Sequence, residues 1–312
     1  MAAAHFAVAN VAKAIADFEP VTILVNPHQA AIAQELCAHP AIQFKKVAID
    51  DSWIRDSGPT FVYESDRGVA GISWRFDAYG GKYPHEHDRQ LSARICDFAG
   101  LPSVAIPLTL EGGAIAVDGS GTVLSTKTAV LDATRNPGLA QADIEALFGQ
   151  YLGATNVIWL NGGLADDDTN GHIDEVAMFV RAGVVLALVR EERSDADYEQ
   201  LAENLDTLRC ARDSSGNPLQ VIPIAAPAVE IHRGRRLSMS YTNCYIANDA
   251  VLVPGFNDPV RDFAAVTALR RAFPDRKVLQ LQTRDISIGG GNIHCITQQQ
   301  PAALNPVTRG TG

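Results

Sequence analysis

A repeating order of predicted elements constrains this chain more than any other feature of its sequence. Four times, a polar motif is followed by two apolar strands, an amphipathic helix and a further strand. The intervals between corresponding motif residues are 55, 61, 71 and 52 positions, for Asp56, Glu111, His172, Asn243 and Cys295. A period of this kind is typical of repeat architectures, in which each unit completes its core against its neighbours.

The two ends of the chain suggest a fifth unit. The last motif, residues 289–301, lacks a following helix and strand, whereas a helix at 6–17 and a strand at 21–26 stand unassigned. We therefore predict a five-fold pseudo-symmetric α/β propeller, whose fifth unit is closed by the N-terminal helix and strand. Its polar motifs would converge at the centre. An ordinary α/β sandwich is the alternative, but it leaves the charged motifs unexplained. We expect one catalytic domain, residues 1–312, with a flexible tail at 301–312.

The composition of the chain limits the classes of protein and ligand that are possible. A length of 312 residues with 46% hydrophobic side chains suffices for a sizeable core. The formal net charge of −10 argues against a nucleic-acid partner and favours cationic ligands. No apolar run approaches the ~20 residues that span a bilayer, and the N-terminus lacks the basic region of a signal peptide. Five widely spaced cysteines match no disulfide framework. We expect a soluble cytoplasmic protein with reduced thiols.

The strongest catalytic candidate is Cys295, in GGGNIHCIT. Most cysteines in strands are small core hydrophobes, but three glycines before this one let backbone or a ligand approach closely. A nucleophilic thiol needs an acid–base partner, for which His172 is the best candidate. On a strand, His172 and Asp174 would share one face. A metal site that adds His294 to these residues is the competing interpretation. We disfavour it because no paired metal-ligand motif is present, and His294 would face away from Cys295 on a strand.

Two further acids are candidates through their position in the repeat. Asp56 lies in DSWIRDSGP, where a turn-forming aspartate is the simpler explanation. Glu111 opens EGGAIAV, where a solvated loop acid is the simpler explanation. Neither is persuasive alone. Their recurrence at matching points of the cycle favours a shared central site.

Together, these motifs resemble the agmatine deiminase family, a group of guanidine-modifying, pentein-fold enzymes related to bacterial peptidylarginine deiminases. The resemblance runs from the N-terminal helix to Pro301, and its most specific segment is GGGNIHCITQQQP; the others are DSWIRDSGPTFV, LEGGAIAVDG, DDDTNGHID and SYTNCYIAN. It implies a five-fold α/β propeller. It also implies hydrolysis of agmatine to N-carbamoylputrescine and ammonia, with neither a metal nor an organic cofactor.

The resemblance assigns a role to each candidate. Cys295 would attack the guanidinium carbon, while His172 protonates the departing ammonia and then activates water. Glu111 would orient His172. Two other acids, Asp56 and Asp174, would grip the guanidinium nitrogens. The indole of Trp53 would pack on the alkyl chain of the substrate.

Three departures from the family pattern leave alternatives open. The chain begins after the Trp-rich first strand of family members, which would leave an open edge and allow a homodimer. Glu175 follows Asp174 where asparagine is common, and DAYGGKY at 77–83 replaces a segment with Asn and Trp. A deiminase of peptidyl-arginine or another alkylguanidine, and a shortened, inactive guanidinium-binding protein, are the alternatives. A metal-dependent ureohydrolase is disfavoured because its metal-binding signatures are absent.

Overall fold

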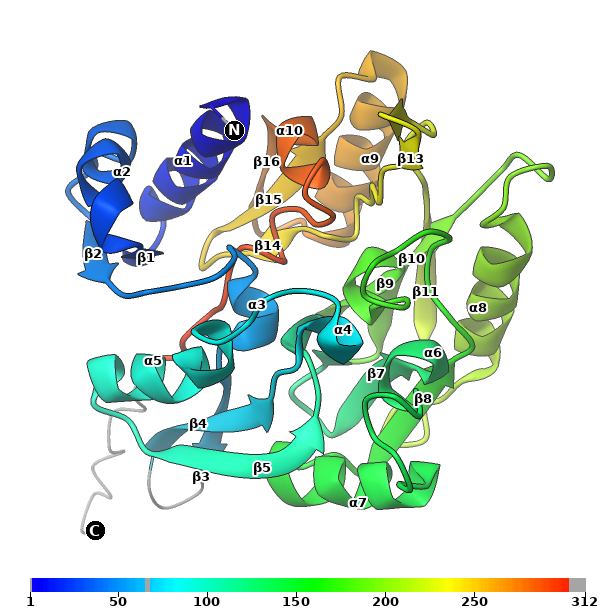
Figure 1. The fold of residues 1–312 in the computed structure, drawn as a ribbon. Coiled ribbons are helices and arrows are strands. Elements are labelled where there is room, and N and C mark those ends of the chain that lie inside the picture. Colours follow the sequence, from blue (N-terminus) through cyan, green and yellow to red (C-terminus); the bar gives the residue numbers. More distant parts are fainter. Residues whose placement is uncertain (1, 65–67, 303–312) are drawn as a thin grey trace, which may run out of the picture.

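The computed structural model describes residues 2–64 and 68–302. The mixed α/β class predicted from the sequence is confirmed. Small sheets are grouped around the middle of the molecule, and three helices lie at its periphery: α7 (Gln141–Leu152), α8 (Tyr198–Cys210) and α9 (Pro259–Ala272) (Figure 1). None of the helices within the described ranges combines the length and apolarity that crossing a membrane requires.

Four three-stranded sheets share one topology. In each, the first strand pairs antiparallel with the second, and the second pairs parallel with the third. The parallel pair is joined through a helix, as such crossovers require. The four units are β3 (Thr60–Glu64), β4 (Gly68–Arg75), α5 (Leu91–Ala99) and β5 (Ser103–Thr109); β6 (Ile115–Val117), β7 (Thr122–Thr126), α7 (Gln141–Leu152) and β8 (Asn156–Leu160); β9 (Ala177–Arg181), β10 (Val184–Val189), α8 (Tyr198–Cys210) and β11 (Gln220–Ala225); and β14 (Tyr245–Ile246), β15 (Ala250–Gly255), α9 (Pro259–Ala272) and β16 (Lys277–Gln282).

The N-terminal region forms a smaller unit. Its strands β1 (Val21–Val25) and β2 (Ile42–Lys46) are parallel and flank α2 (Ala30–Leu36), while α1 (Ala2–Ala16) precedes them. The predicted N-terminal helix and strand are therefore present. The expectation that Cys295 lies on a strand is wrong: it lies in a turn at 293–296, where the backbone N–H groups of Ile296 and Thr297 donate to the nearby carbonyls of Asn292 and His294 and not to a neighbouring strand.

Local sequence explains the ends of the main helices. Asp258 caps α9 by accepting a hydrogen bond from the backbone N–H of Arg261, and Pro259 occupies the first helical position. The helix α5 ends at Gly100, whose φ of +66° is the left-handed geometry of a C-terminal cap. The central strand β10, VVLALV, is almost entirely buried, as expected of a strand covered on both faces.

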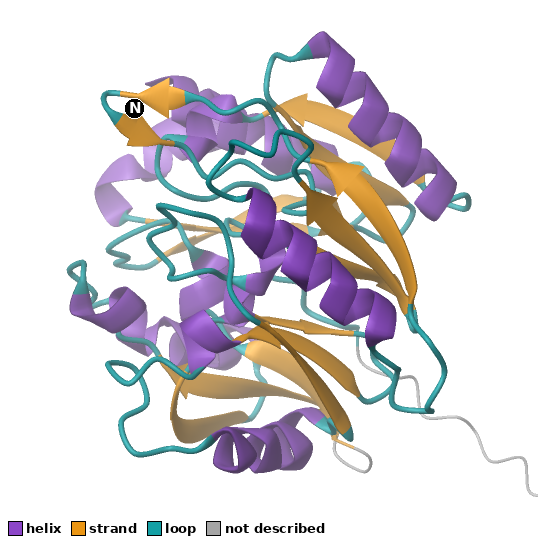
Figure 2. Ribbon diagram, turned by 90° about the vertical axis from the view of Figure 1, so that its right-hand side faces the viewer, coloured by secondary structure: helices purple, strands orange, loops and turns teal. Residues whose placement is uncertain are grey.

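The short elements occupy the connections. They are α3 (Ile54–Ser57), α4 (Ala78–Gly81), α6 (Lys127–Val130), α10 (Arg284–Ser287), the 3-10 turns η1 (Pro27–Gln29), η2 (Asp88–Gln90), η3 (Gly112–Ala114) and η4 (Ile173–Glu175), and the hairpin β12 (Ile231–His232) and β13 (Arg235–Arg236). Figure 2 shows the sheets and helices stacked with many loops between them. The polar motifs at 56, 111, 172 and 243 each precede the first strand of a unit. The repeat therefore delivers chemically similar segments to equivalent points of the fold.

Candidate active site

Three predicted site residues meet over Gly113, in η3. A Cβ atom added to Gly113 would lie 2.6 Å from His172 Nδ1 and 2.8 Å from Asp56 Oδ1. It would also lie 3.1 Å from Asp174 Oδ2. Glycine is required here because no other residue leaves room for these side chains. Residues that are 118 positions apart, from 56 to 174, thus form one buried cluster.

Asp56 is held by two donors. The backbone N–H of Gly113 donates to Oδ1 at 2.9 Å, and the Tyr79 hydroxyl donates to Oδ2 at 2.9 Å. Tyr79 is buried in α4 with a φ of +64°, which is strained for a residue other than glycine. Backbone strain of this kind persists where the surrounding structure over-determines it, and it is common at functional sites. The strained tyrosine fixes the direction in which the Asp56 carboxylate points.

His172 lies between two carboxylates. Its Nδ1 is 3.7 Å from Asp56 Oδ1, and its Nε2 is 3.4 Å from Glu111 Oε2. The other oxygen of Glu111 accepts a hydrogen bond from the Nε of Arg135 at 2.9 Å, and both of these side chains are fully buried. Because η4 starts directly after His172, the predicted strand geometry is wrong here, although His172 and Asp174 do reach the same cluster.

Cys295 borders this cluster through Asp174. Its Sγ lies 3.7 Å from Asp174 Oδ2 and 3.1 Å from Asn243 Nδ2, which donates toward the sulfur. A Cβ atom at Gly291 would lie 2.9 Å from Cys295 Sγ and 2.7 Å from the indole of Trp53. The glycine run therefore allows the indole and the sulfur to approach the same strip of backbone. Trp53, at the start of α3, therefore lies beside Cys295.

His294 does not face away from the site, contrary to the sequence expectation. Its Nδ1 lies 2.7 Å from Asp174 Oδ2, the atom that also contacts Cys295. The alternation rule fails because residues 293–296 form a turn, in which neighbouring side chains can point the same way. Asp174 is thus the common neighbour of His294, Cys295 and the cluster over Gly113.

Burial and charge shift the acidities of the central groups. Burial raises the pKa of Asp56 to about 6, against the opposing effect of His172. Burial alone would lower the pKa of His172, but the charges of Asp56 and Glu111 raise it to about 9. Burial, together with the charge of Asp174, raises the pKa of the Cys295 thiol well above its usual range. At neutral pH the site therefore holds an imidazolium at His172, ionised carboxylates at Asp56, Glu111 and Asp174, and a neutral thiol at Cys295.

Two arginines of the site were missed from the sequence. Arg55 is buried and donates to the carbonyl of His294 and to Gln299 Oε1. Its backbone N–H donates to the carbonyl of Cys295 at 3.1 Å. Arg135 comes from the connection after α6, which carries no periodic or motif signal. A charge next to Asp56 in the first motif is the only signal that could have pointed to Arg55.

Glu175 is a further acid whose role the sequence left open. It is 2% exposed, and its Oε1 accepts a hydrogen bond from Asn243 Nδ2 at 3.0 Å. Burial, with the charge of Asp174, raises the pKa of Glu175 well above its usual range. Asn243 thus contacts both Glu175 and Cys295, as expected for a motif residue that reaches the centre.

Three loops meet beside the glycine run. Lys82 Nζ donates to the carbonyl of Asp168 at 2.6 Å, and the Tyr83 hydroxyl donates to Asp168 Oδ2 at 2.9 Å. The same carboxylate forms an ion pair with Arg235, on β13. A Cβ atom at Gly290 would lie 3.3 Å from the Arg235 guanidinium. The loop before His172 therefore lies beside the segment that carries Cys295.

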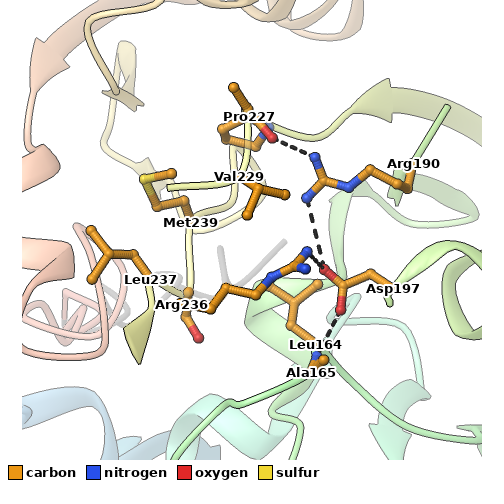
Figure 3. A pocket seen from close by; sticks show the side chains of 11 residues that line it. Leu164, Ala165, Arg190, Asp197, Pro227, Val229, Arg236, Leu237 and Met239 are labelled. Carbon is orange, nitrogen blue, oxygen red and sulfur yellow. Dashed lines mark hydrogen bonds and ion pairs between the residues drawn. The ribbon is translucent and has the colours of Figure 1, made fainter. Parts of the chain in front are cut away.

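A separate cavity lies between β13, β10 and the loop before α8, and none of the predicted site residues lines it (Figure 3). Arg190, Asp197 and Arg236 line its polar side, and Met239 and Leu237 lie opposite. Its free volume of about 10 Å³ holds at most one water molecule. This cavity is too small for a substrate. A more open hollow of about 430 Å³ adjoins it along Arg190 and Arg236, and none of the predicted site residues lines that hollow either.

Residues 1–301 match the family model of Porphyromonas-type peptidyl-arginine deiminase. The chain is 38% identical over 323 aligned positions to a Pseudomonas aeruginosa protein named agmatine deiminase. An agmatine deiminase of Ectopseudomonas mendocina is equally similar. Both alignments cover 96% of this chain and 88% of the relative.

A solved structure of agmatine deiminase from Enterococcus faecalis has the same fold. The two structures superpose with a TM-score of 0.89 at 33% sequence identity. The match covers 95% of this chain and 87% of the Enterococcus chain. The similarity therefore extends over the whole α/β architecture that brings the polar motifs together.

Proposed function

Because the chain belongs to the agmatine deiminase family, which the Porphyromonas-type peptidyl-arginine deiminase model also describes, we propose that it hydrolyses agmatine to N-carbamoylputrescine and ammonia. One observation carries the proposal: Asp56, His172 and Asp174 converge over Gly113 beside the thiol of Cys295. A flat cation needs carboxylates at its edges and a nucleophile at its face, and this cluster supplies both.

Each residue has a role that its surroundings support. Asp56 and Asp174 hold the guanidinium nitrogens, and the indole of Trp53 packs on the alkyl chain. The imidazolium of His172 donates a proton to the departing ammonia, since its pKa of about 9 keeps it protonated at neutral pH. Glu111 orients His172, and Arg135 in turn fixes Glu111. The neutral imidazole left behind then activates the water that hydrolyses the thiouronium intermediate.

The substrate itself activates the nucleophile. In the free protein, burial and the neighbouring acids hold Cys295 as a thiol. A bound guanidinium adds positive charge beside the sulfur and offsets these acids, so it favours the thiolate. The rate of alkylation of Cys295 against pH should shift to lower pH when an unreactive guanidinium compound is bound. An unchanged profile contradicts this activation.

A product assay tests the proposal. The purified protein is incubated with agmatine and EDTA, and ammonia, the ureido product and urea are quantified. Ammonia with N-carbamoylputrescine is the expected result, whereas urea indicates a ureohydrolase and no product indicates an inactive binding protein. Arginine and peptides with C-terminal arginine serve as alternative substrates. A higher kcat/KM on a peptide than on agmatine contradicts the substrate assignment.

The repeat supports a finer account of the architecture. We propose that the four three-stranded units and the N-terminal unit form a pseudo-symmetric five-fold propeller around the site, as one catalytic domain. The common topology of four sheets and the equivalent positions of their motifs support this arrangement. The expected tail at 301–312 lies outside the described residues from position 303 onward. A homodimer and a cytoplasmic location remain predictions.

A further inference from the structure

Glu175 is an acid beside the nucleophile in addition to Asp56 and Asp174. The proposed reaction assigns no role to Glu175. One ligand-type atom from each of Asp174, Glu175 and Cys295 lies within 4.8 Å of the others, and all three side chains are buried. The first two are adjacent in η4, and Cys295 comes from the turn after α10. The three groups therefore surround one point from two separate segments.

Two carboxylate oxygens of this group lack hydrogen bonds within the described part of the chain. They are Asp174 Oδ1 and Glu175 Oε2. The free oxygen of Asp174 is explained by the proposed function, in which Asp174 binds the guanidinium group. Glu175 is 2% exposed, and an unpartnered polar atom at that depth costs about 1–3 kcal/mol. A ligand that accepts electron pairs from buried oxygens would remove this cost.

The donor set defines the class of ligand. Two carboxylates and a thiolate suit Zn²⁺, which binds sulfur at about 2.3 Å and oxygen at about 2.1 Å, so tetrahedral ligands lie about 3.6 Å apart. The separation of Cys295 Sγ and Asp174 Oδ2 is 3.7 Å. Mg²⁺ and Ca²⁺ prefer oxygen ligands alone, and a sulfur ligand disfavours them.

We propose that Asp174, Glu175 and Cys295 form an inhibitory site for a thiophilic divalent cation such as Zn²⁺. The protons of the Cys295 thiol and of the Glu175 carboxyl group pass to solvent as the two side chains bind the ion, and a water molecule fills the fourth position. Because the ion occupies the nucleophile and one guanidinium carboxylate, it excludes the cationic substrate. The competition with agmatine rests on the proposed function, whereas binding of the ion does not.

Cobalt makes the site visible without turnover. Co²⁺ replaces Zn²⁺ in tetrahedral sites, and a cysteine ligand gives a sulfur-to-cobalt charge-transfer band in the near ultraviolet. The full chain is titrated with Co²⁺ in a Cys210→Ser background, because Cys210 is exposed and could bind the metal unspecifically. We expect the band to appear, Zn²⁺ to abolish it, and Mg²⁺ to leave it unchanged. No band, or an undiminished band in Cys295→Ser, overturns the proposal.

Two variants test how much Glu175 contributes to the affinity for Zn²⁺. Loss of a partner outside the ligand shell already weakens metal sites about 10–100-fold, so Glu175→Gln should weaken Zn²⁺ binding about 100-fold or more. Glu175→Asn is the second variant, and circular dichroism checks the folding of both. Wild-type affinity in either folded variant overturns the site as described.

If neither variant folds, the proposal is tested on the unsubstituted protein, by measuring whether a bound ion protects Cys295 from alkylation. Zn²⁺, but not Mg²⁺, should protect Cys295 from iodoacetamide, and EDTA should restore the reaction. Equal alkylation with and without Zn²⁺ contradicts the proposal. An enzyme that binds Co²⁺ through sulfur yet leaves agmatine intact would refute the proposed function alone, so the two failures are distinct.

Discussion

Two buried clusters of charged residues in this protein differ in how completely their carboxylate oxygens are paired. In the cluster beside the cavity of Figure 3, Arg190 and Arg236 form ion pairs with Asp197. Both arginines also pair with Asp195, so two cations face two anions. Each carboxylate oxygen there has a hydrogen-bond or ion-pair partner, including Asp197 Oδ1, which accepts from the backbone N–H of Ala165. Arg190 Nε, which forms an ion pair with Asp195 Oδ2, has no hydrogen bond within the described residues. In the centre, by contrast, Asp174 and Glu175 each keep one oxygen without a hydrogen bond in the described residues.

The acidities differ in the same way. Burial would raise the pKa of Asp195, but its hydrogen bonds and the nearby arginines lower it. The pKa of Asp56 in the centre rises to about 6, because burial outweighs the effect of His172. A structural ion cluster thus completes its own charges, whereas a site for a cation leaves part of its negative charge unpaired. This difference separates binding chemistry from structural support.

The largest effect is expected at the nucleophile. Cys295→Ser should lower kcat for agmatine by at least about 10⁴-fold, since removal of a nucleophile removes the covalent route. The matched control is Cys210→Ser, which changes an exposed cysteine and should stay within about twofold of wild type. Steady-state kinetics with equal amounts of folded protein gives the ratio. A Cys295→Ser variant with wild-type kcat contradicts the assignment.

One substitution made in both clusters should have opposite effects. Asp56→Asn should lower kcat/KM by about 10²–10⁴-fold, because it removes a guanidinium contact and a charge that holds the proton on His172. The free energy of unfolding should stay equal or rise, since ionised Asp56 is costly where it lies. Asp197→Asn should instead lower the free energy of unfolding by about 3–5 kcal/mol, because it leaves buried arginines uncompensated.

Urea unfolding at pH 7 measures this contrast. The activity of Asp197→Asn, expressed per folded molecule, should change little, because Asp197 does not contact the central cluster. If both variants lose the same stability, or if Asp56→Asn remains fully active, the distinction between the two clusters fails.

The smallest effect is a gradual dependence on pH. Asp56 must be ionised, so kcat/KM should rise with pH up to about 6. His172 must be protonated, so kcat/KM should fall above about 9. Each limb changes about tenfold per pH unit. In Glu111→Gln the alkaline limb should move to lower pH, since Glu111 helps to hold the proton on His172. A profile flat from pH 5 to pH 10 contradicts both roles.

The sequence predicted the participants of the centre better than their geometry. Motifs at equivalent points of the repeat identified Asp56, Glu111, His172 and Cys295 without any coordinates. The strand geometry assigned to His172 and Cys295 was wrong, because alternation applies only to extended backbone and both residues border tight turns. Where the backbone turns, the direction of a side chain depends on tertiary contacts that periodicity does not encode.

The residues that hold the site acids in place were harder to predict from the sequence. Arg135 and Tyr79 are buried in connections, where an arginine or tyrosine is usually exposed or half-exposed. Nothing in their local sequence separates them from surface residues. Their partners, Asp56 for Tyr79 and Glu111 for Arg135, lie 23 and 24 positions earlier in the same repeat, and no helical or strand periodicity links the two positions, so only the folded chain explains why they are inside.

The bonds between Arg55 and the segment that carries Cys295 link residues up to 244 positions apart. Synthesis on the ribosome proceeds from the N-terminus, so four motifs have emerged before the sulfur is added to the chain. A nascent chain can therefore form most of its sheets before it contains the nucleophile Cys295. The site is therefore complete only once residues 289–299 have been synthesised and lie against α3.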